Sequence, residues 1–591
     1  MIEQKGIMKN FSYEEEELLR AFLFTNPHGN DSFVYAQPLV QGEELSPLMS
    51  AYSRTHVPMQ DRTLQFLDTA KTDQSRAFLS HIRPIMEIFR HPDGTLKISE
   101  KTGEFNREWV LDHGHNSIKE ETALFGHVEN ISDIVGKKIT GNPLNKPQVK
   151  STRYISYGKV LDLTAQDVDI LSLPNNSRYL EYITFMNQRY LDVTEQLVDK
   201  VLHDSNTLHI IDFLRQPHII EREVQGAIEK KIRTKVNFHP TSADYETERK
   251  KYLDGLEEKA VKVDIRKFVY DSSRVYLVAG TKTSLGHSVD ARTLEAIITD
   301  MLSSPRQEDQ QRGQSLWNEA KKIAPVLLGQ KSHICIDQWK VENEKILRNY
   351  FQNQFRRIPA VEWPQTVSSI IPERKHLDRY NAAFVLFSYL ESSFQDIYNA
   401  ITSQDVADVL AKVHEYRGHH DVLHPGLSHN GITYEQVMAY HGYRDLFRHR
   451  NGARSVQLLT MRLGFEIPPL FEAFGLAPQY IEDMEKAKII YEEGRKHDKH
   501  VAEKLVPFGF HSRALHSWSP HQVGYVGDLR TKIKTGNYAY VKTARQVVRS
   551  AAEIMPETAK YFRYDKSEYP AYLWKRGFEW FDTVRRPIVM K

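Results

Sequence analysis

The chain has 591 residues, of which 40% are hydrophobic and 26% charged, so it is long enough for two or more globular domains and too apolar for a disordered protein. Its 79 Lys and Arg residues nearly balance its 77 Asp and Glu residues, which excludes the global positive field of a general nucleic-acid-binding protein and makes any anion site a local one. The single cysteine, Cys335, excludes an intrachain disulfide and a cysteine-rich metal site, and it favours a reducing, cytoplasmic location.

The chain divides into four predicted segments. Residues 1–45 are expected to form a leader with one short acidic helix, which lacks the apolar core of a signal peptide. Residues 46–330 carry long amphipathic helices and a few strand-like runs such as 274–278, and they form a first domain. Closely spaced prolines predict a connector over residues 331–379, and residues 380–591 form a second domain. No run reaches about 18 apolar residues, so we expect no membrane span.

Residues 443–455 of the second domain carry the strongest chemical signal. Basic side chains cluster there at the end of a run with helical spacing, namely Arg444, Arg448, His449, Arg450 and Arg454. Guanidinium groups match phosphate oxygens bidentately, and a helix end adds its dipole and free backbone groups. A solvated basic face is the more common explanation of an isolated Arg-His-Arg triplet. This triplet is flanked by further basic motifs within residues 417–420 and 513–530, which favours an anion-binding site.

The order and spacing of these motifs resemble the flavin-dependent thymidylate synthase family. Its members carry a His-Gly-His motif, an Arg-His-Arg triplet, a Ser-x-Arg-Tyr ending, an Asn-Ala-Arg-Ser segment and two later arginines. The second domain keeps the triplet and both later arginines, at Arg448-His449-Arg450, Arg513 and Arg530. The first domain keeps the other motifs, at His113-Gly114-His115, Ser151-Thr152-Arg153-Tyr154 and Asp290-Ala291-Arg292-Thr293.

Each domain lacks what the other retains. In the first domain, other residues stand at the positions of the triplet and the later arginines, namely Gly141-Asn142-Pro143, Ser284 and Met301. In the second domain, the Ser-x-Arg-Tyr ending is replaced by Leu458, Thr460 and Met461. If the protein had lost its function, the motifs would be expected to disappear at random from both domains. The complementary pattern of loss therefore argues against a non-functional protein.

The resemblance implies an α+β fold with two copies of one unit, each a small mixed or antiparallel sheet flanked by long helices. Members of the family are homotetramers whose active sites lie at subunit interfaces, where residues from different subunits hold flavin and dUMP. We therefore expect a homodimer that forms a pseudo-tetramer of four such units, with composite sites between unlike domains.

The reaction implied by the resemblance is the synthesis of dTMP from dUMP. Hydride passes from NADPH to FAD, and methylenetetrahydrofolate supplies the one-carbon unit. No cysteine nucleophile is required, which agrees with the position of Cys335 in the predicted connector, away from every motif.

The same resemblance assigns roles to individual residues. The implied substrate-binding residues are Ser151, Arg153, Tyr154, Arg513 and Arg530. Of these, Arg530 is the candidate catalytic residue, because a guanidinium can polarise the pyrimidine electrostatically. The implied cofactor-binding residues are His115, Arg292, His419, Arg448, His449 and Arg450.

Two other functions are compatible with these motifs. A catalytically silent protein that binds a nucleotide or flavin, or that serves in assembly, would carry the same residues. So would a relative that performs another flavin-dependent modification at C5 of a uracil nucleotide. A metal site at His420 and His424 is not expected, because Pro425-Gly426 interrupts the helix that would place them together.

Overall fold

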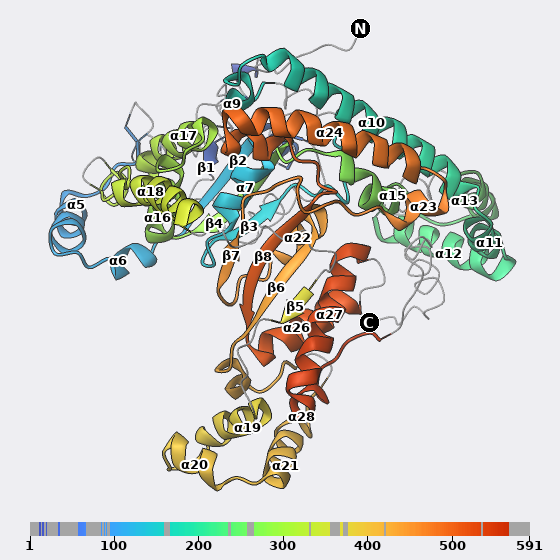
Figure 1. Ribbon diagram of the computed structural model, residues 1–591. Coiled ribbons are helices and arrows are strands. Elements are labelled where there is room, and N and C mark those ends of the chain that lie inside the picture. Colours follow the sequence, from blue (N-terminus) through green and yellow to red (C-terminus); the bar gives the residue numbers. More distant parts are fainter. Residues whose placement is uncertain are drawn as a thin grey trace. The chain divides into compact units, whose positions relative to one another are not determined.

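The computed structural model describes residues 95–158, 166–234, 238–256, 265–329, 332–354, 367–369, 376–418, 421–532 and 536–566, and shorter stretches that include 33–35 and 57–66. Helices dominate these residues and the strands form antiparallel sheets, which confirms the predicted α+β class (Figure 1). None of the helices described is long and apolar enough to cross a membrane.

Two four-stranded antiparallel sheets share one strand order. The first has the order β1-β2-β4-β3 and consists of β1 (Phe33–Tyr35), β2 (Leu124–Ser132), β3 (Lys146–Val149) and β4 (Lys282–Val289). The second has the order β5-β6-β8-β7 and consists of β5 (Val367–Ser369), β6 (Ile432–Ala439), β7 (Arg454–Val456) and β8 (His511–Trp518). Each strand of the first sheet therefore has a counterpart in the second, as expected of an internal duplication.

The pairing registers extend this correspondence to single residues. Ser132 pairs with Lys282 at the end of β2, and Ala439 pairs with His511 at the end of β6. The sheets differ at a β-bulge between Val128 and Ile131, where β2 carries an extra residue. Asn130 lies in this bulge with φ 53°, a left-handed conformation that asparagine tolerates better than most residues.

The helices that follow the strands also correspond. Helix α7 (Asp133–Thr140) follows β2, as α22 (Tyr440–Leu446) follows β6. Helix α16 (Ala291–Leu302) follows β4, as α26 (Pro520–Thr531) follows β8. The last two helices begin with equivalent caps, because the side chain of Asp290 accepts from the amide of Thr293 and that of Ser519 from the amide of Gln522.

Two compact units emerge from the contacts within the chain, and neither is one continuous segment. The first comprises residues 1–185, 278–361 and 489–506, and the second comprises residues 186–277, 362–488 and 507–591. Each unit thus combines one sheet with a segment from the other half of the sequence. The contiguous domains at 46–330 and 380–591 stay a prediction, and strands β1 and β5 precede those boundaries.

The core of the first unit lies between its sheet and two helices. Val128 and Leu285 of the sheet are fully buried with Leu294 of α16 and Leu316 of α17 (Gln307–Ile323). Burying such a side chain contributes about 1.5–3 kcal/mol relative to leaving it exposed. The remaining helices described in this unit are α3 (Met59–Phe66), α5 (Glu100–Phe105), the π-helix η1 (Asn106–Asp112), α6 (Ser117–Glu120), α9 (Val168–Leu171), α18 (Gln338–Gln354), α25 (Lys499–Ala502) and η5 (Glu503–Leu505).

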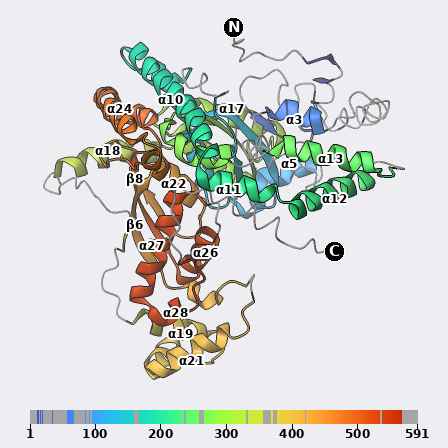
Figure 2. The same cartoon turned by 90° about the vertical axis from the view of Figure 1, so that its right-hand side faces the viewer.

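In the second unit, helices α22, α26 and α27 (Tyr538–Ile554) lie along the second sheet in both views (Figures 1 and 2). Gly442 of α22 permits a close approach to both β6 and α27: a Cβ there would lie 2.7 Å from Met438 Cε and 2.8 Å from Ala539 Cβ. The unit also contains α11 (Ser205–Leu214), α12 (Pro217–Thr234), α13 (Ser242–Asp254), α15 (Arg266–Ser273), α19 (Leu377–Phe387), α20 (Phe394–Ala400), α21 (Ser403–His414), η4 (Pro425–Ser428), α23 (Pro469–Ala473) and α28 (Pro556–Ala559). Two long helices have residues in both units, α10 (Asn176–Leu202) and α24 (Ala477–His497).

One secondary-structure prediction is wrong. The strand-like run 274–278 begins with a 3₁₀ helix, η3 (Arg274–Tyr276), which directly continues α15. All its residues are buried, and after Arg274 the sequence shows a short apolar run, which does not distinguish a buried helical turn from a buried strand.

Candidate functional site

In the second unit, basic residues of the predicted motifs interact in pairs: His449 with Arg530 and Arg448, and Arg454 with Arg450. We call these five residues the arginine cluster: Arg448, His449, Arg450, Arg454 and Arg530. The Arg-His-Arg triplet follows the C-terminal end of α22, where the cap residue is Phe447. That end of a helix carries partial negative charge, so the helix itself does not favour an anion there. Any attraction for an anion comes from the guanidinium groups.

Arg530 is anchored by His449. Its Nε donates to His449 Nε2 over 2.7 Å, and its Nη2 donates to the main-chain oxygen of Asp445 over 3.2 Å. Burial, reinforced by the neighbouring charge of Arg530, lowers the pKa of His449 to about 3. The imidazole is therefore neutral, accepts at Nε2 and carries its proton on Nδ1. Nδ1 lies 3.4 Å from Gln522 Nε2, and because both atoms are donors in this tautomer, Nδ1–H is satisfied by Gln522 only when the side-chain oxygen of Gln522 is turned toward it. His449 thus supports Arg530 and adds no positive charge to the cluster.

The other arginines make the cluster strongly cationic. Arg454 Nη1 donates to the main-chain oxygen of Phe447 over 2.6 Å, and its guanidinium lies 3.9 Å from the centre of the Phe447 ring. Burial lowers the pKa of both Arg450 and Arg454, and the charge of Arg450 adds to the effect on Arg454. Arg448 is exposed, with its Nη2 3.9 Å from Asp445 Oδ1. Partly desolvated guanidiniums of this kind bind anions more strongly than fully hydrated ones.

Arg513 lies on the other face of the same sheet. It stands on β8 between Ser512 and Ala514, and Ser512 pairs with Met438, the residue against which α22 packs. Because side chains alternate along a strand, Arg513 points away from the face that α22 covers. Its Nε lies 3.2 Å from Glu435 Oε1. The second unit therefore does not bring Arg513 and Arg530 together.

Ser151, Arg153 and Tyr154 lie directly after β3 in the first unit. The Ser151 hydroxyl accepts from the amide of Arg153 over 3.3 Å, so this hydroxyl shapes a turn. The Arg153 guanidinium lies 5.9 Å from the centre of the Tyr154 ring, and Ser151 and Arg153 are both buried. Burial also lowers the pKa of the adjacent Lys150, an effect that the charge of Glu129 opposes.

His115 follows the π-helix η1 and belongs to a group of aromatic rings. Its ring centre lies 5.6 Å from that of Trp109 and 6.4 Å from that of His113, with Gly114 between the two histidines at φ 75°. Arg292, in the first turn of α16, forms an exposed ion pair with Glu120. His419 and His420 lie outside the described residues.

The sequence analysis missed a pair of buried histidines. His287 on β4 corresponds to His516 on β8, and both are fully buried. Among the described residues, neither ring nitrogen of either histidine has a hydrogen-bond partner. Burial lowers the pKa of His287 to about 4 and that of His516 to about 3. The signal was the recurrence of histidine at the same place in two strands, which becomes visible only once the strands are aligned.

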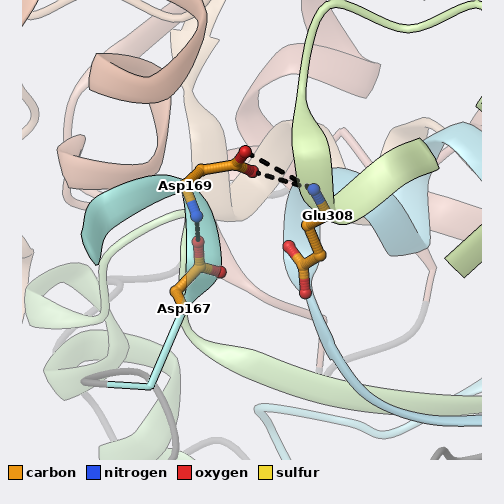
Figure 3. Close-up of side chains that lie close together, drawn as sticks. All are labelled: Asp167, Asp169 and Glu308. Atoms are coloured by element: carbon orange, nitrogen blue, oxygen red, sulfur yellow. Dashed lines mark hydrogen bonds between the residues drawn. The ribbon is translucent and has the colours of Figure 1, made fainter. Parts of the chain in front are cut away.

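Three buried carboxylates also escaped the sequence analysis: Asp167, Asp169 and Glu308 of the first unit (Figure 3). Their spacing suits a metal ion, but the Nζ of Lys504 lies among them, 2.7 Å from Asp167 Oδ1 and 2.6 Å from both Asp169 Oδ2 and Glu308 Oε2. Lys282 Nζ adds contacts of 2.6 Å to Asp167 and Glu308. Lysine ammonium groups thus supply the positive charge, and the cluster does not fit a metal centre.

Of the comparisons with known proteins, the match to a family model agrees with the motif analysis. Residues 68–326 match the model of the thymidylate synthase complementing protein family. UPF0159 protein Ta1429 of Thermoplasma acidophilum is 22% identical over 84% of this chain and 94% of its own length. A UPF0159 protein of Chlamydia muridarum is 22% identical over 96% of this chain and 97% of its own length. Among solved structures, a UMP/dUMP methylase PolB from Streptomyces cacaoi with bound 5-Br dUMP is 14% identical, with a TM-score of 0.27, over 33% of this chain and 93% of its own.

Proposed function

We propose that this chain is a member of the thymidylate synthase complementing protein family, whose model matches residues 68–326, and that it is a flavin-dependent enzyme acting at C5 of a uracil nucleotide. Its specific reaction in this proposal is the synthesis of dTMP from dUMP with methylenetetrahydrofolate and NADPH. The observation that carries the proposal is the anchoring of Arg530 by neutral His449 within the arginine cluster. A guanidinium held in place can stabilise negative charge that develops on a pyrimidine oxygen without first reorganising.

The donor chemistry of the arginine cluster fits the phosphates of FAD. Arg448 is exposed and Arg450 is half-buried, so their guanidiniums can offer charge-assisted hydrogen bonds to an anion. These two residues would hold the cofactor, whose contribution when bound is hydride chemistry. His115, Arg292 and His419 remain the family-implied positions for further cofactor contacts.

Ser151, Arg153 and Tyr154 are proposed to bind the nucleotide together with Arg513 and Arg530. Hydrogen bonds to charged groups contribute about 1.5–3 kcal/mol each, so two or three of them would give the phosphate several kcal/mol of binding free energy. Because Arg513 and Arg530 occupy opposite faces of one sheet, one nucleotide contacts both only if different copies of the chain contribute them. This is an argument for the proposed homodimer with composite sites.

The test is an absorption spectrum of the purified protein with FAD, followed by titration with dUMP and an assay for dTMP. We expect a bound-flavin spectrum that shifts with dUMP, and loss of dTMP formation in Arg530→Ala with flavin still bound. Arg249→Ala is the matched control, because Arg249 is an exposed arginine of α13 far in sequence from every motif. Absence of flavin binding at high FAD concentration would overturn the proposal.

A catalytically silent binding protein is the second candidate. It is favoured by the ion pair of Arg513 with Glu435 and by the two hydrogen bonds of Arg530, which show both arginines engaged within the protein. Flavin and nucleotide binding without any product would support this candidate. A product other than dTMP, identified by mass spectrometry, would instead indicate a different C5 modification.

A further inference from the structure

The two halves of the chain exchange equivalent segments. The amides of Ala279 and Gly280 in the first unit donate to the oxygens of Val506 and Lys504, each over 2.8 Å. In the second unit, the amides of Phe508 and Gly509 donate to the oxygens of Leu277 and Val275, over 2.8 and 3.1 Å. The second set of bonds is the first set with the repeats interchanged. Residues 274–277 of the first repeat therefore complete the second unit, and residues 503–506 of the second repeat complete the first.

The exchanged segments carry different charges at equivalent positions. Lys282 of β4 and His511 of β8 are equivalent residues, because each pairs with the last residue of the neighbouring strand, β2 or β6. Arg274 and Glu503 lie the same number of residues before them and are therefore equivalent, as are Val275 and Lys504. In the first unit, Glu503 Oε2 accepts from Arg306 Nη1 over 2.8 Å. Lys504 lies in the carboxylate cage, the group of Asp167, Asp169 and Glu308 described above.

The second unit has the opposite polarity. Arg274 Nη2 donates to Asp445 Oδ2 over 3.2 Å, and both side chains are almost fully buried. A buried charge that loses its partner is strongly destabilising, so a segment with the wrong charges would destabilise the unit that it completes.

We propose that the carboxylate cage and Arg306 form a docking site selective for residues 503–506 of the second repeat over the chain's own equivalent segment, residues 274–277. Docking of the first repeat's own segment would place Arg274 against Arg306. It would also put Val275 where the Lys504 ammonium now neutralises three carboxylates. In the second unit, the reverse replacement would set Glu503 against Asp445. Both unexchanged arrangements bury like charges together, which is how specific interfaces reject a wrong partner.

The first test is amide hydrogen exchange in the full-length protein with Lys504→Met. Loss of the ammonium is expected to speed exchange of the Ala279 and Gly280 amides at least about tenfold, because local opening then costs less. The amides of Phe508 and Gly509 should keep their rates. Lys119→Met is the matched control, since Lys119 is also a fully buried lysine of the first unit and pairs with Glu295 over 2.6 Å. Equal acceleration in both variants would overturn the proposal.

A second set of variants tests selection by charge. Glu503→Arg should lower the melting temperature more than Glu503→Gln, because only the former creates a like-charge contact with Arg306. The double variant Lys504→Met, Asp169→Asn loses one ammonium charge and one carboxylate charge. The net charge of the three cage residues together with positions 282 and 504 is then the same as in the wild type, so much of the exchange protection lost in Lys504→Met alone should return. This combination also keeps the proposal testable if Lys504→Met does not fold. Equal losses for the two Glu503 variants, or no recovery in the double variant, would exclude selection by charge.

Discussion

Arg530 Nε lies 2.7 Å from His449 Nε2, so a residue of the Arg-His-Arg triplet holds the predicted catalytic arginine. The two residues are far apart in sequence and come from α26 and the turn after α22. Their contact requires an unprotonated imidazole, which burial ensures by lowering the pKa of His449 to about 3. The triplet therefore contributes two arginine charges and one neutral support.

His449→Leu is expected to lower dTMP formation about 100-fold, in line with the loss of one oriented donor, because Arg530 loses its acceptor. His449→Gln keeps a carbonyl acceptor and should lose about tenfold or less. The measurement is kcat and KM for dUMP, with bound flavin quantified in each variant. If both variants keep wild-type rates, His449 does not position Arg530 for catalysis.

Because His287 and His516 are buried as neutral imidazoles, we expect the free energy of unfolding to decrease as the pH is lowered. The folded-state pKa of His516 is about 3 and that of His287 about 4, both below the ordinary histidine value of 6.5, so the unfolded chain binds protons that the folded chain rejects. Each histidine's contribution is intact above pH 6.5. It falls by about 1.4 kcal/mol per pH unit between 6.5 and its folded pKa.

His516→Leu should remove the pH dependence that His516 contributes. As pH falls from 7 to 4.5, the free energy of unfolding of this variant should therefore decrease less than that of the wild type. The change at pH 7 should be small, because an apolar side chain replaces an imidazole without hydrogen-bond partners. Leu515→Ala, on the other face of β8, is a control without a titrating group. Parallel pH profiles for the wild type and His516→Leu would contradict the assignment.

At the triplet and at the first later arginine, the motif comparison aligned the two repeats on the same residues as the sheet registers, whereas it did not predict the extra residue in β2. When the two repeats are aligned by the observed registers, Ser284 is equivalent to Arg513, and Gly141-Asn142-Pro143 is equivalent to the triplet. The motif comparison predicted both equivalences. The exchange of segments 274–277 and 503–506 was not predictable, because spacing along a chain does not reveal which sheet a segment completes. The carboxylate cage was also missed, since charged residues in helical sequences are usually solvent-exposed and nothing in the sequence pairs Lys504 with Asp167.

The bulge in β2 predicts a specific response at Asn130. Its φ of 53° is accessible to glycine and strained for β-branched residues. Asn130→Gly should change the free energy of unfolding by less than about 1 kcal/mol, whereas Asn130→Val should lower it by about 1–3 kcal/mol. Chemical denaturation of the two variants provides the comparison. Equal stability of the two would mean that the backbone adopts another conformation there.

Gly442 and Gly226 should respond in opposite directions to the same substitution. A Cβ at Gly442 would lie 2.7 Å from Met438 Cε and 2.8 Å from Ala539 Cβ, so Gly442→Ala should push α22 away from the sheet and cost about 1–3 kcal/mol. Gly226 lies within α12, where a Cβ would meet no atom within 4 Å. Gly226→Ala should therefore stabilise the protein by about 0.5–1 kcal/mol through helix propensity.

Because α22 leads directly into the turn that carries His449, Gly442→Ala should also weaken flavin binding, whereas Gly226→Ala should leave it unchanged. A stabilising effect of Gly442→Ala in thermal unfolding would show that α22 and α27 do not pack as closely on the second sheet as the structure indicates.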